Sequence, residues 1–509
     1  MNFLNENILT IILLVPLGGA ILIALLPDRG TLSQWLAMLT ALLSFALTLH
    51  LPFHFATGQS GFQFEINRPW IESPAIFYHV GIDGLSLWLV VLVGFLAPVG
   101  VLVSWNAIRD RRKIFYSLFL VQQTAMVGVF ISLDLMLYYG FWELSLLPMA
   151  ILIAMFGRKE GPKAAIKFFL YTFIPSAPLL VAILWLYAHT GTFNFVALQR
   201  IIANGGLPAT ALAWVALAFL FAFAVKVPIF PLHGWLADTF SEAPVALAMI
   251  VAGKLGLYSM LRFHVELFPQ QAKLIAPLVV ALAVIGLLYG ACLALVQRDF
   301  WRLIAYAAIS HLSLIALGIY GFNMTGWDGA VYQILSHGVV DAAIFLLLGI
   351  LELRYGTSEI AAYGGLAAKL PRAATLFVIA TLAMIGLPLL SGFVGEFLIL
   401  SSTFTQVSHG WGIAGTVGVI LGAAYMLWLV QRLFYGQESR LAAARQAMDL
   451  PLAEQLMLWP IAVLMLVMGV APSLWFPSIE SNTLMMTVQS QNAAPKIILS
   501  GSVQVGVKR

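Results

Sequence analysis

Long apolar runs repeat along almost the whole chain and constrain its fold more than any other sequence feature. A helix needs roughly 20 apolar residues to cross a bilayer core of about 30 Å, and runs of that length follow one another here. Only 9% of the residues are charged, whereas a soluble domain has about 25%. The sequence therefore predicts an all-α integral membrane protein of about fourteen transmembrane helices. The predicted spans are 8–26, 31–51, 83–105, 114–132, 134–156, 164–189, 208–236, 243–264, 274–296, 301–320, 327–351, 372–403, 410–434 and 454–476.

Lysine and arginine predict which side each loop faces, because basic loops stay in the cytoplasm. Alternate loops contain Arg29; Arg109, Arg111, Arg112 and Lys113; Arg158, Lys159 and Lys163; Arg298 and Arg302; Arg354, Lys369 and Arg372; and Arg432, Arg440 and Arg445. The other inter-helix loops contain only Arg68, Arg200 and Lys273. This asymmetry predicts both termini in the periplasm of a bacterial inner membrane. The run within Met1–Leu26 lacks the basic start and cleavage site of a signal peptide, which predicts a retained first helix.

Several functional classes are excluded by composition and motifs. The net charge of +4 lies in short loops between apolar runs, which argues against nucleic-acid binding. Cys292 is the single cysteine, so a disulfide framework, iron–sulfur ligation and a zinc ribbon have no ligands in this sequence. There is also no glycine-rich phosphate loop in a soluble fold and no nucleophile arrangement. The chain alone is predicted to catalyse no bond chemistry and to hold no cofactor or metal.

Two predicted spans are too long and contain prolines near mid-membrane. The span 208–236 contains Pro228 and Pro231, and the span 372–403 contains Gly386-Leu-Pro388. Proline removes a backbone donor and clashes with the preceding turn, so helices 7 and 12 are predicted to break. Broken helices at matching places in two halves are typical of transporter inverted repeats. The alternative is two ordinary proline kinks.

The two breaks suggest a division of the chain into four parts. These parts are a three-helix region (1–113), a first five-helix repeat (114–264), a second inverted repeat (274–434) and a C-terminal part (435–509) with a loop, the last helix and a tail.

Ionisable residues within the apolar runs are the candidate functional site. A charge at mid-bilayer costs from about 2.5 to above 10 kcal/mol, so each group needs a partner, water or a neutral form. The candidates are Glu143, Lys226, Lys254, His311, His337 and Glu396. Asp341 lies one turn after His337 on the same helix face. Spread through both halves, groups that can gain and lose protons predict a proton path, in which Glu143 and Lys226 form a modulating pair.

Each of these residues also has a structural interpretation. Glu143 and Lys226 can be a static ion pair, and a lone interior histidine is often only a hydrogen-bonded core residue. A haem held by His311 and His337 would need facing helices and a roomy pocket. Asp341 can fix the tautomer of His337. Lys167 is expected to snorkel to the cytoplasmic surface, and Asp134 and Arg262 are expected at the membrane interface.

Three motifs resemble a known family. They are Phe141-Trp-Glu143 with Pro148-Met149, Ala224-Val-Lys226-Val-Pro228 running into Pro231-Leu-His233, and Arg302-Leu-Ile-Ala-Tyr-Ala-Ala-Ile-Ser-His311. In combination they resemble the antiporter-like, proton-translocating subunits of NADH:quinone oxidoreductase (complex I) and of the Mrp cation/proton antiporters. The segment Gly392-Phe-Val-Gly-Glu396-Phe looks like the subunit M (chain 4) branch, in which an acid stands where other branches carry lysine. The 33 residues after the last predicted span (477–509) are too few for the long lateral helix of the subunit L branch.

The resemblance implies a non-redox membrane subunit, coupled to quinone reduction elsewhere in the complex. Glu143 and Lys226 would be the coupling pair, Lys254 the central relay and Glu396 the terminal group, with His311 and His337 between them. NAD, flavin, iron–sulfur clusters and quinone would belong to partner subunits, and L-like and N-like chains would be neighbours in the bilayer. The alternative is an Mrp-type sodium/proton antiporter subunit.

The sequence departs from the family at the predicted cytoplasmic entrance. Ala237 and Phe240 replace the usual proline and second histidine after His233, and Glu242 is a candidate to compensate. Asp341 also departs from typical members, and its role stays open.

Overall fold

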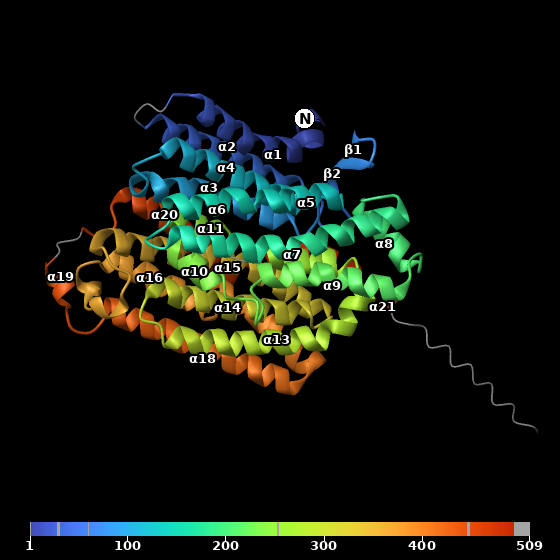
Figure 1. The fold of residues 1–509 in the computed structure, drawn as a ribbon. Helices are drawn as coiled ribbons and strands as arrows, with labels where there is room; N and C mark the ends of the chain where they lie inside the picture. Colours follow the sequence, from blue (N-terminus) through green and yellow to red (C-terminus); the bar gives the residue numbers. More distant parts are fainter. Residues whose placement is uncertain (1, 28–30, 60, 252–253, 445–447, 493–509) are drawn as a thin grey trace, which may run out of the picture.

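The protein is a bundle of roughly parallel helices (Figure 1) in a computed structural model that describes residues 2–27, 31–59, 61–251, 254–444 and 448–492. The helices of membrane-spanning segments and their continuations are α1 (Asn2–Leu25), α2 (Leu32–His54), α3 (Leu87–Ala107), α4 (Arg112–Ile131), α5 (Leu135–Leu144), α6 (Leu146–Phe156), α7 (Gly161–Thr190), α9 (Ala209–Lys226), α11 (Val245–Val251), α12 (Lys254–Ser259), η1 (Met260–Val265), α13 (Pro269–Leu295), α14 (Phe300–Ile319), α15 (Met324–Tyr355), α16 (Pro371–Met384), α17 (Ser391–Ser402), η4 (Thr403–Val407), α18 (His409–Phe434) and α20 (Leu452–Val470). The remaining elements are β1 (Gln63–Ile71), β2 (Ile76–Ile82), α8 (Phe195–Ala203), α10 (Leu236–Glu242), η2 (Ile360–Ala362), η3 (Leu366–Ala368), α19 (Arg440–Ala444), η5 (Pro472–Leu474) and α21 (Phe476–Asn492).

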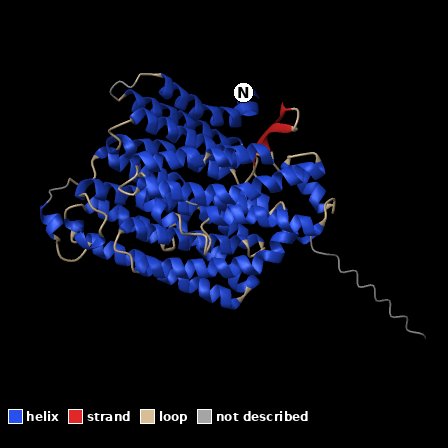
Figure 2. Cartoon of the chain, viewed as in Figure 1, coloured by secondary structure: helices blue, strands red, loops and turns tan. Residues whose placement is uncertain are grey.

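The all-α membrane architecture predicted from the apolar runs is confirmed. Within the described residues, thirteen helical segments are long and apolar enough to cross a membrane, and α16 is a shorter apolar helix. With its continuation α17, α16 occupies the position of the predicted twelfth span. Figure 2 shows that strand is confined to one small hairpin at an end of the bundle.

The two long spans that were predicted to break, 208–236 and 372–403, are both interrupted. Helix α9 ends at Lys226 and α10 begins at Leu236, with non-helical chain between them. Helix α16 ends at Met384 and α17 begins at Ser391. The relation of 114–264 to 274–434 as inverted repeats stays a prediction.

Two elements at one end of the bundle were not predicted. Strands β1 and β2 pair antiparallel, with Ile66 opposite Val80, and α21 follows the last span and packs against α15. The predicted span 454–476 is wrong at its C-terminal end, because α20 stops at Val470, two residues before Pro472. Proline cannot continue a helix without losing a hydrogen bond.

Helix α15 forms the centre of the bundle. In its most apolar 18-residue stretch, 100% of the residues are buried inside the protein, whereas the corresponding share is 33% in α2 and in α20. Helices α3, α11, α14, α16, α17, α20 and α21 pack around it. A helix that is apolar on all sides is expected to be surrounded by protein. Polar groups on α14 and α15 are therefore enclosed by other helices rather than exposed to lipid.

Candidate functional site

A line of ionisable side chains runs through the centre of the bundle, beginning at Lys254. Its ammonium Nζ lies 3.8 Å from Oδ2 of Asp341 and 3.5 Å from the carbonyl oxygen of Met249. The same Asp341 oxygen lies 2.8 Å from Nδ1 of His337, one helical turn earlier on α15. Lys254 and Asp341 come from different helices, α12 and α15, so the line crosses the helix packing rather than following one helix.

The line continues through the two predicted histidines to Glu396. The rings of His337 and His311 have centroids 5.5 Å apart. Nδ1 of His311 lies 3.7 Å from Oε1 of Glu396, and Nε2 of His311 lies 3.1 Å from the Tyr425 hydroxyl. The structure thus brings together four of the six predicted site residues and adds Asp341 and Tyr425. We call the five groups Lys254, Asp341, His337, His311 and Glu396 the polar axis.

The interrupted helix next to Glu396 allows its carboxylate to approach the backbone. Gly386, between α16 and α17, has φ of +69°, a conformation that glycine adopts without steric penalty. A Cβ atom at this position would lie 2.3 Å from Oε2 of Glu396. Gln333 donates from Nε2 to the other carboxylate oxygen at 3.3 Å. The break therefore provides room for a buried carboxyl group.

Lys226 lies apart from the polar axis, at the end of α9. It is 4% exposed, and its Nζ lies 5.2 Å from the centroid of a Trp142 ring and 5.6 Å from that of Phe168. Aromatic faces attract a cation at such distances. The Trp235 indole donates to the carbonyl oxygen of Val225 at 2.8 Å and so satisfies a carbonyl that the end of α9 leaves free.

Glu143 follows Trp142 on α5 and is half-buried. Glu143 and Lys226 are both described, and they do not form an ion pair within 4.0 Å, although they lie close enough to interact electrostatically. Oε1 of Glu143 is buried without a hydrogen-bond partner among the described residues. The geometry is that of two separated charges rather than a closed static pair.

Several polar atoms along these groups have no hydrogen-bond partner in the described part of the chain. They include both ring nitrogens of His337, both carboxylate oxygens of Asp341, Oε1 of Gln333 and Oε1 of Glu143. The 2.8 Å contact of His337 with Asp341 is close, but it does not have hydrogen-bond geometry. Buried polar groups in proteins are normally paired with protein or ordered water. A cavity of about 10 Å³ between His311 and Glu396 approaches the size needed for one water molecule.

A recess of about 510 Å³ lies at the end of the bundle that carries the basic loops. Lys167 pairs there with Asp238 at 2.6 Å, and Arg302 approaches the same carboxylate at 3.6 Å. Glu242 also lines the recess and accepts from the backbone amide of Glu160 at 2.9 Å. The carboxyl group of Glu242 is thus present at the predicted entrance, where it is held by the backbone.

Sequence reasoning did not identify the partners of Arg262 and overlooked two neutral groups. Arg262 was expected at the interface; it lies in the last turns of its span, where it is 0% exposed and contacts Asp83 and Glu266. Its partners lie 179 residues away and one turn away, and the first separation has no signature in a single sequence. Tyr425 and Gln333 are ordinary helix residues by sequence, and no signal identified them. Within the described residues, no group of three or more His, Cys, Asp or Glu is arranged to hold a metal ion.

Comparison with known proteins gives consistent matches over most of the chain. The family described as "NADH:quinone oxidoreductase/Mrp antiporter, TM" matches residues 132–422. The NADH-quinone oxidoreductase subunit M of Rhodobacter capsulatus is 38% identical over 488 residues, which cover 92% of this chain and 94% of the relative.

Solved structures extend this similarity to the fold. A chain of respiratory complex I from Thermus thermophilus, determined with bound NADH, matches with a TM-score of 0.86 and 31% identity, covering 95% of this chain and 99% of that chain. A chain of the Mrp complex from Dietzia sp. DQ12-45-1b matches with a TM-score of 0.82 at 20% identity, covering 96% and 97% of the two chains. The second match concerns the fold alone.

Proposed function

Because this chain belongs to the antiporter-like, proton-translocating membrane subunits of NADH:quinone oxidoreductase (complex I), in the subunit M branch, we propose that its polar axis is the route by which protons cross the membrane. The observation that carries the proposal is the row of neighbouring ionisable groups from Lys254 through Asp341, His337 and His311 to Glu396. Ionisable groups are placed within a membrane protein at considerable cost, and they mark proton relays and ion pathways.

Acids placed beside bases allow protons to move with little separation of charge. Each member of the axis has an oppositely charged or chargeable partner within about 4 Å. At that distance, two unit charges interact by roughly 4 kcal/mol at an effective dielectric of 20. The unpartnered atoms of His337 and Asp341 are available to water, which would complete the hydrogen-bonded path between groups that are not in direct contact.

Glu143 and Lys226 are two separated charges that could couple proton movement in this subunit to its neighbours. Lys226 is the last residue of α9, directly before the interruption of the seventh span. A change in the separation of the two charges would change the energy of each protonation state. We propose that such a change couples this subunit to its neighbours.

The electron chemistry is proposed to lie in other subunits. This chain would act as a non-redox part of the translocase, with NAD, flavin, iron–sulfur clusters and quinone bound by partner chains. Other membrane-arm subunits of complex I are its partners, and we propose that L-like and N-like chains are among them.

The proposed orientation of the subunit in the membrane is based on the basic loops, which stay in the cytoplasm. The recess containing Lys167, Asp238 and Glu242 is proposed as the cytoplasmic entrance, and the end bearing β1, β2, α8 and α21 is proposed as the periplasmic side. Both termini are proposed to lie in the periplasm of a bacterial inner membrane.

The test is to replace Lys226 and Glu143, one at a time, in the whole complex. Lys226→Ala and Glu143→Ala are each expected to lower proton pumping and quinone reductase turnover several-fold while the complex still assembles. Lys273→Ala is the matched control, because Lys273 is an exposed lysine near the start of α13 and lies outside the proposed entrance. Assembled Lys226→Ala complexes that pump and turn over like the Lys273→Ala control would contradict the proposal. Pumping that requires sodium would instead favour the Mrp-type alternative.

A further inference from the structure

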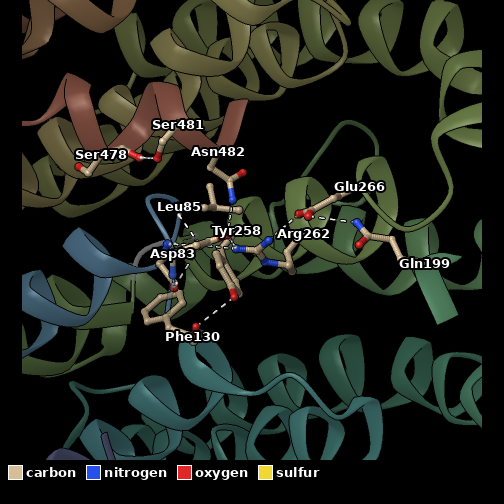
Figure 3. Close-up of polar contacts among 11 residues, drawn as sticks. Asp83, Leu85, Phe130, Gln199, Tyr258, Arg262, Glu266, Ser478, Ser481 and Asn482 are labelled. Carbon is tan, nitrogen blue, oxygen red and sulfur yellow. Dashed lines mark hydrogen bonds and ion pairs between the residues drawn. The ribbon is translucent and has the colours of Figure 1, made fainter. Parts of the chain in front are cut away.

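A second group of buried charges surrounds Arg262, which lies in the last turns of the span Val245–Val265. Figure 3 shows its polar contacts. Nη2 of Arg262 donates to both carboxylate oxygens of Asp83 at 2.5 Å, and Nη1 donates to Oε2 of Glu266 at 2.6 Å. The exposed fractions of Arg262, Asp83 and Glu266 are 0%, 2% and 5%. We call these three residues the outer cluster. The proton path proposed above does not use it.

The charges of the outer cluster do not balance. One arginine faces two carboxyl groups, and the remaining polar contacts are neutral: Gln199, Asn482 and the backbone amides that bind Asp83. Among the residues that line the adjoining cavity, Arg200 of α8 is also positively charged, but its side chain is exposed to solvent. With both acids ionised, the cluster holds an uncompensated buried negative charge, which is costly. Binding one proton makes it neutral.

The two acids differ in how well their charged forms are stabilised. Asp83 accepts two bonds from Arg262, one from Asn482, and bonds from the amides of Leu85 and Ser86, and hydrogen bonds of this kind favour a carboxylate. Glu266 accepts one bond from Arg262 and one from Gln199 Nε2 at 3.1 Å. Glu266 directly follows the span Val245–Val265, and its burial raises its pKa to about 7, against the opposing effect of Arg262.

Glu266 also lies between the protein interior and two cavities. One cavity of about 330 Å³ is lined by Gln199, Arg200, Glu266 and Gln489. The other, of about 550 Å³, is lined by Glu266, Glu65 and His79 among others. The Glu65 carboxylate is 46% exposed and lies 2.7 Å from Nε2 of the buried His79. A proton on Glu266 therefore has acceptors that lead to the aqueous surface.

The same helical segment connects Glu266 to the polar axis. Lys254 precedes Glu266 by twelve residues, roughly 18 Å of helix. Hydroxyl groups lie along this stretch, where Tyr138 donates to Ser259 at 2.8 Å and Tyr258 donates to the carbonyl oxygen of Phe130 at 3.0 Å.

We propose that Glu266 is a proton-release group on the outer side of the membrane, with Arg262 and Asp83 as fixed charges that hold it in place. The proposal rests on the proton-translocating function proposed above, which Lys226→Ala tests separately. It adds a release group on the outer side to a path whose last member, Glu396, is buried. A purely structural role for the outer cluster is the competing explanation, since the cluster joins η1 to the start of α3 and to α21.

The test measures proton pumping by the whole complex in proteoliposomes while the pH on the outer face is varied. If release from Glu266 limits pumping, the wild-type rate should fall by up to about tenfold as the outer pH is lowered from about 8 to about 6, because a group with a pKa near 7 then stays protonated. Glu266→Gln should assemble, pump more slowly and lose this dependence on outer pH. Glu480→Gln is the matched control, because Glu480 is an exposed acid on α21 at the same end.

Glu266→Asp keeps the test decisive if the glutamine variant does not assemble. It retains the carboxyl group but withdraws it by one methylene, so the midpoint of the outer-pH dependence should shift. If both variants retain the wild-type midpoint and rate while Lys226→Ala stops pumping, the release site is wrong and the proposed function stands. If Lys226→Ala pumps normally, the proposed function itself is contradicted, and with it the release site that depends on it.

Discussion

Gly338 is a position at which a single methyl group should disturb the polar axis without disturbing the fold. A Cβ atom at Gly338 would lie 2.7 Å from Cε of Lys254 and 2.5 Å from Cδ2 of Leu92. Both atoms lie near the ends of flexible side chains, which can move while the helix stays in place. Alanine also favours the helix by about 1 kcal/mol relative to glycine. Gly338→Ala should therefore shift the Lys254 side chain and leave α15 intact.

The size of the effect follows from the geometry. Restoring ordinary contact at 3.4–4 Å requires the Lys254 side chain to move by about 1 Å from the 2.7 Å position. Gly338 and Asp341 are three residues apart on one face of α15, so we expect a lysine side chain displaced from Gly338 to carry its ammonium away from the carboxylate. At an effective dielectric of 20, lengthening the 3.8 Å separation by that amount weakens the attraction by about 1 kcal/mol. The corresponding change in the protonation equilibrium is about fivefold.

The assay is proton pumping by assembled complexes that carry Gly338→Ala, with Gly349→Ala as the matched control. Gly349 also lies on α15, and a Cβ there would meet Cγ2 of Val245 at 2.8 Å, with no charged group among its nearest atoms. We expect pumping to fall by up to about fivefold in Gly338→Ala and to stay near wild type in the control. If the two variants pump at the same rate, whether that rate is normal or reduced, the assigned role of the Lys254–Asp341 contact is refuted.

Substitutions at two further positions test other parts of the polar axis. Glu396→Lys should retain more pumping than Glu396→Ala in assembled complexes, because related branches of the family are expected to carry lysine there. Equal pumping by the two variants would show that position 396 is not equivalent to the lysine position of those branches. Asp341→Asn should lower pumping several-fold, because it removes the charge between Lys254 and His337 while keeping nearly the same shape; a normal pumping rate would exclude Asp341 from the path.

The sequence was sufficient to predict most of the membrane-spanning helices and the ionisable residues within them. Apolar runs report helix length directly, and a charge inside such a run is conspicuous wherever it points. Pro228, Pro231 and Pro388 likewise marked the places where the seventh and twelfth predicted spans are interrupted. These inferences depend only on residues that are close together in the sequence.

What the sequence did not provide were pairings between distant elements. Asp341 was noted for its spacing from His337, but its contact with Lys254 depends on how α12 packs beside α15. Arg262 was expected at the interface, but its contact with Asp83, at the start of another span, could not be inferred from the sequence. Helix α21 is too polar to resemble a membrane span, and its position comes from packing against α15.

The two groups of buried charges differ in the type of cation that they use, and this difference suggests a division of roles. Lysine and histidine lose a proton readily enough to pass it on, whereas the arginine guanidinium stays protonated in proteins. In the polar axis, both kinds of partner can therefore change charge, which is what a relay requires. In the outer cluster Arg262 is a permanent charge that binds Asp83 firmly and leaves Glu266 as the member able to exchange a proton with the adjoining cavities. If Arg262→Lys assembled and kept the wild-type response to outer pH, a permanent charge would not be needed at this position, and the distinction between relay and anchor would fail.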